Sequence, residues 1–273
     1  MSPRTFLIHG LIAGFVAGIL AFGAAYVFGE PSIESAIALE EAAASGHAHG
    51  EGARAHGHGN AHDHDDARDG GHSHGDEGGV SRAQQSTAGL ATATIVIGVA
   101  LGGVVGLAAA FALGRLGRLS PAASTALVAV AGFVAFALAT WAKYPPNPPA
   151  TGSGDTIGAR TAAYFGFQAV SVLLAVGAVV LGSRLARRGD GWLASVVPAV
   201  GWLVLVTAAG LALPAFDEIP GDFPATVLWS FRFSSLITQI VLWGTLTVVL
   251  SGLVRRTARA AAARRELIES VRA

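Results

Sequence analysis

Residues 87–113 read TAGLATATIVIGVALGGVVGLAAAFAL, a run without a single charged side chain. The hydrocarbon core of a bilayer is about 30 Å thick, and about 20 apolar residues in an α-helix cross it. A helix in the core of a soluble domain does not need an apolar run of this length. The run therefore predicts a membrane-spanning helix.

Five further runs of the same kind lie at about 5–28, 121–142, 161–182, 191–213 and 229–254. Only 13% of the residues are charged, whereas soluble domains have about 25%. The first run is longer than the roughly 7–15 apolar residues of a signal peptide, so we expect a retained helix there. The sequence thus predicts an all-α fold, a polytopic membrane helix bundle of about six transmembrane helices in contact with the lipid bilayer.

This reading divides the chain into five parts. They are a first transmembrane helix at 1–30, a short surface helix at 31–44, a His/Asp/Gly-rich loop at 45–86, a five-helix membrane bundle at 87–254 and a basic tail at 255–273.

The distribution of basic residues predicts which side of the membrane each loop occupies. Short cytoplasmic loops carry an excess of Lys and Arg. With a cytoplasmic amino terminus, the inside segments hold Arg4, Arg115, Arg118, Arg184, Arg187, Arg188, Arg255, Arg256, Arg259, Arg264, Arg265 and Arg272. The outside segments hold only Arg54, Arg68, Arg82, Lys143, Arg160 and Arg232. We therefore expect both termini in the cytoplasm (N-in/C-in) and the loop at 45–86 outside.

Glycines recur every four residues in the first two spans. Gly10, Gly14 and Gly18 share one face of the first, and Gly98, Gly102 and Gly106 share one face of the second. Small residues at this spacing let two helix backbones approach closely in lipid. The alternative is that a glycine-rich composition produces the pattern by chance.

Eight of the nine histidines lie in residues 45–79, which we call the His segment. It has almost no large apolar residue, so we expect it to be disordered when no metal is bound. Neutral imidazole binds divalent first-row metals, and nearby carboxylates add oxygen ligands. The candidate metal ligands are His47, His49, His56, His58, His62, His64, His72, His74, Asp63 and Asp65. Imidazole does not select one metal, and a solvated spacer with incidental binding is the alternative.

Polar residues in or beside the spans are candidates for a transport path, because such residues are costly in a membrane. They are His9, Glu34, Glu41, Gln168, Asp217, Glu218, Arg232 and Gln239. For the residues inside helices the alternative is a hydrogen bond to a neighbouring helix, and for the acids it is a solvated face. We expect Arg232 to pair with an acid, either one of those at 217–222 or Glu34. We expect two outer loops, 143–160 and 213–236, to be structured. The first is dense in proline, which favours a stiff, extended conformation.

Several functions are disfavoured. Lys143 is the only lysine and stands in WAKYPPN, so the chain has no phosphate-binding loop that ends in Gly-Lys-Ser/Thr. The chain has no cysteine, and neither paired catalytic carboxylates nor a nucleophile constellation lies within the spans, so we expect no enzymatic activity. Nothing points to nucleic acid, and the oligomeric state is open.

Four stretches carry a family resemblance: IESAIALEE, RAQQSTAGL, KYPPNPPATGSGDTIGARTAAYF and LPAFDEIPGDFPATVLWSFRFSSLITQIVLWG. In these the chain resembles the CbtA family of probable cobalt transporter subunits. The resemblance implies a bacterial inner-membrane protein for cobalt uptake, linked to cobalamin synthesis, with a small single-span partner, CbtB. The family is usually described with about five spans, whereas this chain has six apolar runs.

Three readings of the function remain. The first is a subunit of an uptake transporter for a divalent metal ion, cobalt or else nickel or zinc, with the His segment capturing the ion outside and no tightly bound cofactor. The second is a membrane-tethered metal buffer or sensor. The third is an exporter, which the expected outside position of the His segment opposes.

Overall fold

The computed structural model describes residues 1–50, 81–117, 119–149, 151–189 and 191–272, and for residues 43–50 it gives the backbone alone. Every regular element in these ranges is helical. Six helical segments are long and apolar enough to cross a membrane: Pro3–Ala42, Arg82–Ala112, Pro121–Lys143, Gly154–Ala186, Gly191–Ala212 and Ala225–Arg272. Each overlaps one of the six apolar runs, so the prediction of an all-α bundle with about six spans is confirmed.

The bundle is organised by a close antiparallel contact between α1 (Pro3–Ala24) and α4 (Leu90–Ala112). A Cβ atom added to Gly14 would lie 2.1 Å from the carbonyl oxygen of Gly98, and one added to Gly10 would lie 2.1 Å from that of Gly102. No side chain fits at such distances, so the two backbones are in direct contact. The glycine spacing therefore marks a real helix–helix interface.

The antiparallel register of this pair continues beyond the glycines. The residue numbers of the pairs Gly10–Gly102 and Gly14–Gly98 each add up to 112. So do those of Glu30 and Arg82, which form an ion pair further along the two helices. One register thus holds from the glycine contact to the ion pair.

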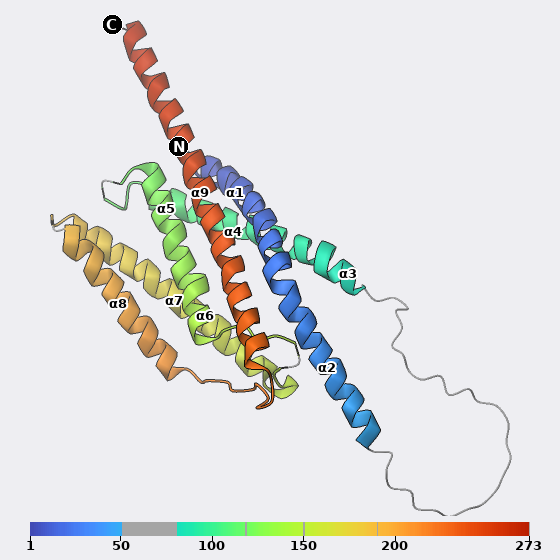
Figure 1. Ribbon diagram of the computed structural model, residues 1–273. Helices are drawn as coiled ribbons and strands as arrows, with labels where there is room; N and C mark the ends of the chain where they lie inside the picture. Colours follow the sequence, from blue (N-terminus) through green and yellow to red (C-terminus); the bar gives the residue numbers. More distant parts are fainter. Residues whose placement is uncertain (51–80, 118, 150, 190, 273) are drawn as a thin grey trace, which may run out of the picture.

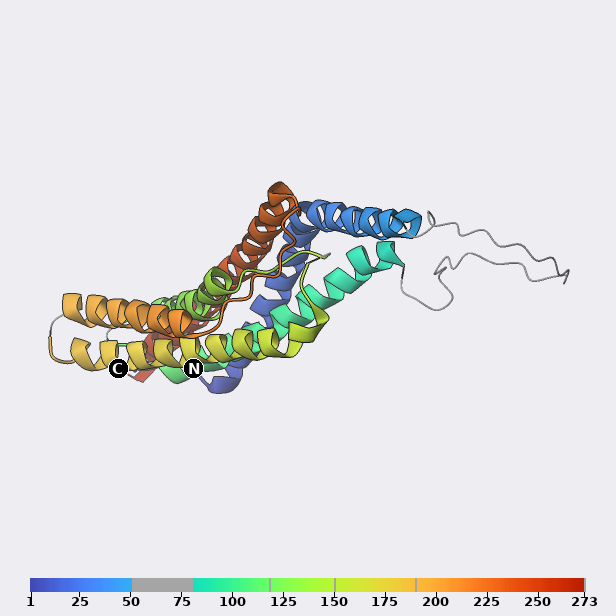
Figure 2. The ribbon, with the colours of Figure 1, turned by 90° about the horizontal axis from the view of Figure 1, so that it is seen from below.

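In each helix of the pair, a π-helical turn lies between the glycine contact and the ion pair. These turns are η1 (Ala25–Gly29) in the first helix and η2 (Gln85–Gly89) in the second. The first helix then continues as α2 (Glu30–Gly50), and α3 (Arg82–Gln84) precedes η2. Figure 2 shows the change of direction between α1 and α2. The surface helix expected at 31–44 is thus continuous with the first span and ends six residues later, at Gly50.

The third and sixth spans pack through aromatic side chains. The third consists of α5 (Pro121–Gly132), the π-helical turn η3 (Phe133–Leu138) and α6 (Ala139–Lys143). The sixth is α9 (Ala225–Arg272), whose Trp243 is 3% exposed and contacts the rings of Phe133 and Phe136. A Cβ atom on Gly132 would lie 2.9 Å from the Trp243 ring, so the glycine makes room for the indole.

The fourth and fifth spans form a pair beside the third (Figure 1). They are α7 (Ile157–Ala186), preceded by the 3₁₀ turn η4 (Gly154–Thr156), and α8 (Gly191–Ala212). Both termini lie at the same end of the bundle as the α4–α5 and α7–α8 turns, and the α6–α7 and α8–α9 connections lie at the opposite end (Figure 1). We call the first the basic end, since it carries the excess of arginine, and the second the outer end, since the arginine distribution predicts that it faces outward.

Substitution of Gly102 by alanine tests the glycine interface. The new Cβ atom would lie 2.2 Å from the carbonyl oxygen of Gly10, so α1 and α4 must separate. Overpacking of this kind costs about 1–3 kcal/mol. We therefore expect a lower unfolding temperature of the protein in detergent, measured by tryptophan fluorescence.

Gly177→Ala in α7 is the matched control, because nothing lies within 4 Å of a Cβ atom there. It should leave the unfolding temperature unchanged or raise it slightly, since alanine is the better helix former. Equal effects of the two substitutions would contradict the close contact.

Candidate functional site

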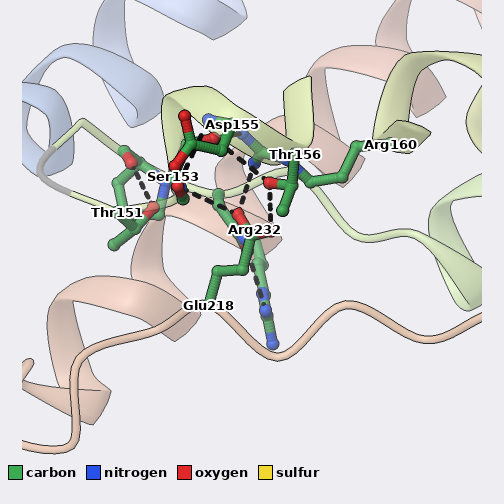
Figure 3. A network of polar contacts seen from close by, with 9 residues as sticks. Thr151, Ser153, Asp155, Thr156, Arg160, Glu218 and Arg232 are labelled. Carbon is green, nitrogen blue, oxygen red and sulfur yellow. Dashed lines mark hydrogen bonds and ion pairs between the residues drawn. The ribbon is translucent and has the colours of Figure 1, made fainter. Parts of the chain in front are cut away.

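Glu218 joins the two connections at the outer end. It lies between α8 and α9, and its carboxylate accepts a hydrogen bond from the backbone N–H of Ser153 at 2.9 Å and another from the Thr156 hydroxyl. The Arg160 guanidinium lies 3.2 Å from the same carboxylate. We call these four residues the outer clamp (Figure 3). Both oxygens of Glu218 therefore already accept hydrogen bonds.

The local chain geometry presents the partners of Glu218 from one short stretch. Ser153 caps η4, and Arg160 in the first turn of α7 donates back to the Ser153 carbonyl at 3.0 Å. Gly152 has a φ of +93°, and a Cβ atom there would lie 2.7 Å from Nη1 of Arg160. Only glycine meets both demands. The backbone N–H of Gly152 also donates to the Glu218 carbonyl at 3.3 Å.

These contacts set the charge state of Glu218. The hydrogen bond from Thr156 lowers the pKa of the carboxyl most, followed by the Ser153 N–H and the charge of Arg160, while desolvation opposes them. Each of the three donors favours the ionised form. The outer clamp therefore holds a carboxylate anion near neutral pH.

A second tie joins the same two connections beside the clamp. The Lys143 ammonium donates to the Leu213 carbonyl at 3.2 Å, and the Tyr144 hydroxyl donates to the Pro214 carbonyl at 2.8 Å. The Tyr144 ring contacts Phe167 on α7 edge-on, and burial raises the pKa of its hydroxyl, which keeps it a donor. The α6–α7 and α8–α9 connections thus form one structural unit.

Arg232 forms no ion pair with any acid in the described part of the chain, which includes Glu34 and the acids at 217–222, so the expected pairing is wrong. Its Nη2 atom donates to Oδ1 of Asn147 at 2.9 Å, and its guanidinium lies 5.4 Å from the centre of the Trp229 ring. The backbone carbonyl of Arg232 accepts from Nε1 of Trp141 at 3.2 Å. The side-chain partner of Arg232 is thus a neutral amide in the run PPNPP, which opposite-charge pairing in the sequence does not predict, and its buried Nε atom has no partner among the described residues.

Gln168 forms a helix–helix hydrogen bond, the alternative to a role in a path. Its side-chain amide on α7 donates to the Phe136 carbonyl at 3.1 Å, and Ser171 one turn further donates to the Ala135 carbonyl at 2.7 Å. Both carbonyls belong to η3. A π-helical turn disturbs the regular backbone hydrogen bonds, so polar groups from a neighbouring helix are needed there.

The other candidates are not brought together. His9 is half-buried on α1 and Gln239 is half-buried on α9, whereas Asp217 is exposed beside the clamp. Glu34 and Glu41 are exposed on α2. Within the ranges that the structure describes, no group of three or more His, Cys, Asp or Glu side chains could hold a metal ion.

Most of the His segment lies outside the described residues. This applies to His56, His58, His62, His64, His72, His74, Asp63 and Asp65. His47 and His49 belong to the last turns of α2, and only their backbone is described. The sequence reading also missed the ion pair of buried Glu30 with Arg82, although Arg82 stands in the family-like stretch RAQQSTAGL.

Replacement of Glu218 by glutamine tests the clamp. Because the folded pKa is lowered, the contribution of Glu218 to stability is present above the ordinary pKa of about 4.3 and is lost as the pH falls through the folded value. We expect Glu218→Gln to unfold at a lower temperature than the wild type at pH 7, with a difference that shrinks below about pH 4. Tryptophan fluorescence of the purified proteins in detergent measures the two unfolding temperatures at each pH.

Asp217→Asn is the matched control, because it removes an exposed carboxylate from the neighbouring position. It should leave the unfolding temperature at pH 7 unchanged. A wild-type advantage over Glu218→Gln that grows as the pH falls would contradict the assigned contacts.

Comparison with known proteins agrees with the resemblance found in the sequence. The model of a family described as probable cobalt transporter subunit (CbtA) matches residues 3–255, which include all six spans except the end of α9. No curated protein and no solved structure matches the chain. A transporter subunit with six apolar helices is a multi-pass protein of the cell membrane, and its family is not an enzyme family. The chain therefore belongs to the CbtA family of probable cobalt transporter subunits.

Proposed function

We propose that this chain is a subunit of an uptake transporter for a divalent transition-metal ion, with cobalt as the substrate, and that the His segment captures the ion outside. The observation that carries the proposal is the arrangement of the outer end. The start of α2 and the start of α3, which the Glu30–Arg82 ion pair joins, lie at the end opposite the termini (Figure 1). The clamped connections lie at that same end, so capture and entry would share one face.

The chemistry of the His segment suits the collection of divalent metal ions rather than the selection of one metal. Eight imidazoles and several carboxylates on one tether raise the local concentration of divalent ions. Imidazole affinity increases from cobalt to nickel to copper, so the segment alone does not favour cobalt. We propose that selectivity arises in the membrane-spanning part.

The membrane potential favours inward movement of the substrate. One elementary charge gains about 2.3 kcal/mol per 100 mV, so a dication gains about twice that amount. The family description as a subunit supports a partner, and we propose a small single-span partner of the CbtB kind. This potential would then drive uptake through the assembled transporter.

One observation favours the second candidate, a membrane-tethered metal buffer or sensor. The side chains of Gln168 and Ser171 both donate hydrogen bonds to carbonyls of η3, so neither donor is free to line a path in this conformation. A buffer needs the His segment and the membrane anchor alone.

Uptake of radioactive cobalt into cells that express the chain with its natural partner separates the two candidates. We expect uptake above the level of cells that lack both proteins. Replacement of the eight histidines of the His segment by asparagine should raise the cobalt concentration for half-maximal uptake at least several-fold and leave the maximal rate unchanged. Competition with nickel and zinc defines the preferred metal.

Asparagine replacement keeps the length of the segment, and deletion of residues 45–79 is the companion variant. Background uptake by the intact pair would overturn the transport proposal. Unchanged half-saturation in the asparagine variant would make the segment a spacer.

A double-mutant cycle tests whether Arg232 and Asn147 act as one unit at the entrance. We expect Arg232→Gln and Asn147→Ala each to lower uptake, and the double variant to be no worse than the more severe single one, because both break the same hydrogen bond. Protein amount in the membrane is measured in parallel. Additive losses would show that the two residues act separately.

A further inference from the structure

An apolar groove of about 650 Å³ lies on the bundle between α4, the third span and α7. Leu101 and Val105 line it on α4, Ala131 on α5, and Val172 and Ala175 on α7. Trp243 of α9, 3% exposed, forms part of its wall. None of these six residues carries a charge, so this part of the groove suits hydrocarbon.

Three arginines line the groove where it reaches the basic end. Arg115 follows α4, and Arg184 and Arg187 stand at the end of α7. All three are exposed, and none forms an ion pair with a carboxylate in the described part of the chain. Arg115 lies 4.4 Å over the Phe111 ring and donates to the Phe111 carbonyl, which holds it at the groove.

The groove has the length of one leaflet. Within the helices, the lining residues run from Leu101 to Ala112 on α4 and from Val172 to Arg184 on α7. These stretches are about 17 and 18 Å long at about 1.5 Å per residue, close to the roughly 15 Å of half the hydrocarbon core. An acyl chain that enters at the arginines would therefore reach the middle of the membrane beside Trp243.

We propose that this groove binds one anionic phospholipid of the leaflet at the basic end. Its phosphate lies among Arg115, Arg184 and Arg187, and one acyl chain fills the groove. Arginine forms paired hydrogen bonds with phosphate oxygens, and basic pockets between membrane helices on the cytoplasmic side are suited to lipid headgroups. An apolar partner helix would fill the groove but would leave the three arginines without counter-charge. This inference concerns binding and is independent of the transport proposal.

Native mass spectrometry of the purified full chain in detergent tests the site. The probes are phosphatidylglycerol and phosphatidylcholine with identical acyl chains. We expect one phosphatidylglycerol to bind in preference to phosphatidylcholine. Replacement of Arg115, Arg184 and Arg187 by glutamine should weaken phosphatidylglycerol binding at least about tenfold, since each basic residue near a membrane surface contributes about fivefold.

The matched control replaces Arg255, Arg256 and Arg259 of α9 by glutamine, which removes the same charge from the same end of the bundle. It should bind phosphatidylglycerol like the wild type. Ala175→Leu narrows the groove and should weaken both lipids while the arginines stay in place. Circular dichroism checks that each variant keeps its helix content.

Four results would overturn the inference. They are equal phosphatidylglycerol binding by the wild type and the Arg115/Arg184/Arg187 variant, an equal loss in the α9 control, no effect of Ala175→Leu, and displacement of the lipid by inorganic phosphate alone, which would indicate a simple anion site. A polypeptide crosslinked from position 175 in the assembled transporter would instead assign the groove to a partner helix.

Discussion

The contact between the backbones of α1 and α4 is the constraint on which the rest of the structure depends. Lipid offers no hydrophobic gain for helix association, so close packing has to hold the helices together. At Gly10 and Gly14 a Cβ atom would lie 2.1 Å from a carbonyl oxygen of the partner helix. This contact fixes the register that brings Glu30 to Arg82, and so fixes where the chain leaves and re-enters the bundle on either side of residues 51–80.

Several polar side chains near the membrane find hydrogen-bond partners within the protein. Arg232 reaches Asn147, Gln168 reaches an η3 carbonyl, and Glu218 gathers three donors. An unsatisfied polar group in hydrocarbon costs several kcal/mol, so such pairs rigidify the regions that hold them. The outer end is therefore a preformed structure, and any passage of an ion there requires that some of these contacts open.

The sequence predicts much of the fold and little of the site, for physical reasons. Span positions follow from apolar length, and the glycine interface follows from a four-residue repeat, both of which are local signals. The partners of Arg232 and Glu218 depend on tertiary contact with neutral groups such as Asn147 and Thr156, which charge pairing does not reveal. The π-helical turns likewise depend on packing, since nothing in FVAFAL distinguishes η3 from ordinary helix.

The central claim is that the clamped end faces outward, so that metal is gathered and enters there. The chain has no cysteine, so a single introduced cysteine reports its own side of the membrane. In intact cells, a membrane-impermeant maleimide should label Asp217→Cys and should label Ser270→Cys near the end of α9 only after the membrane is permeabilised. The reverse pattern, with Ser270→Cys labelled in intact cells and Asp217→Cys protected, would place the His segment in the cytoplasm and contradict capture from outside.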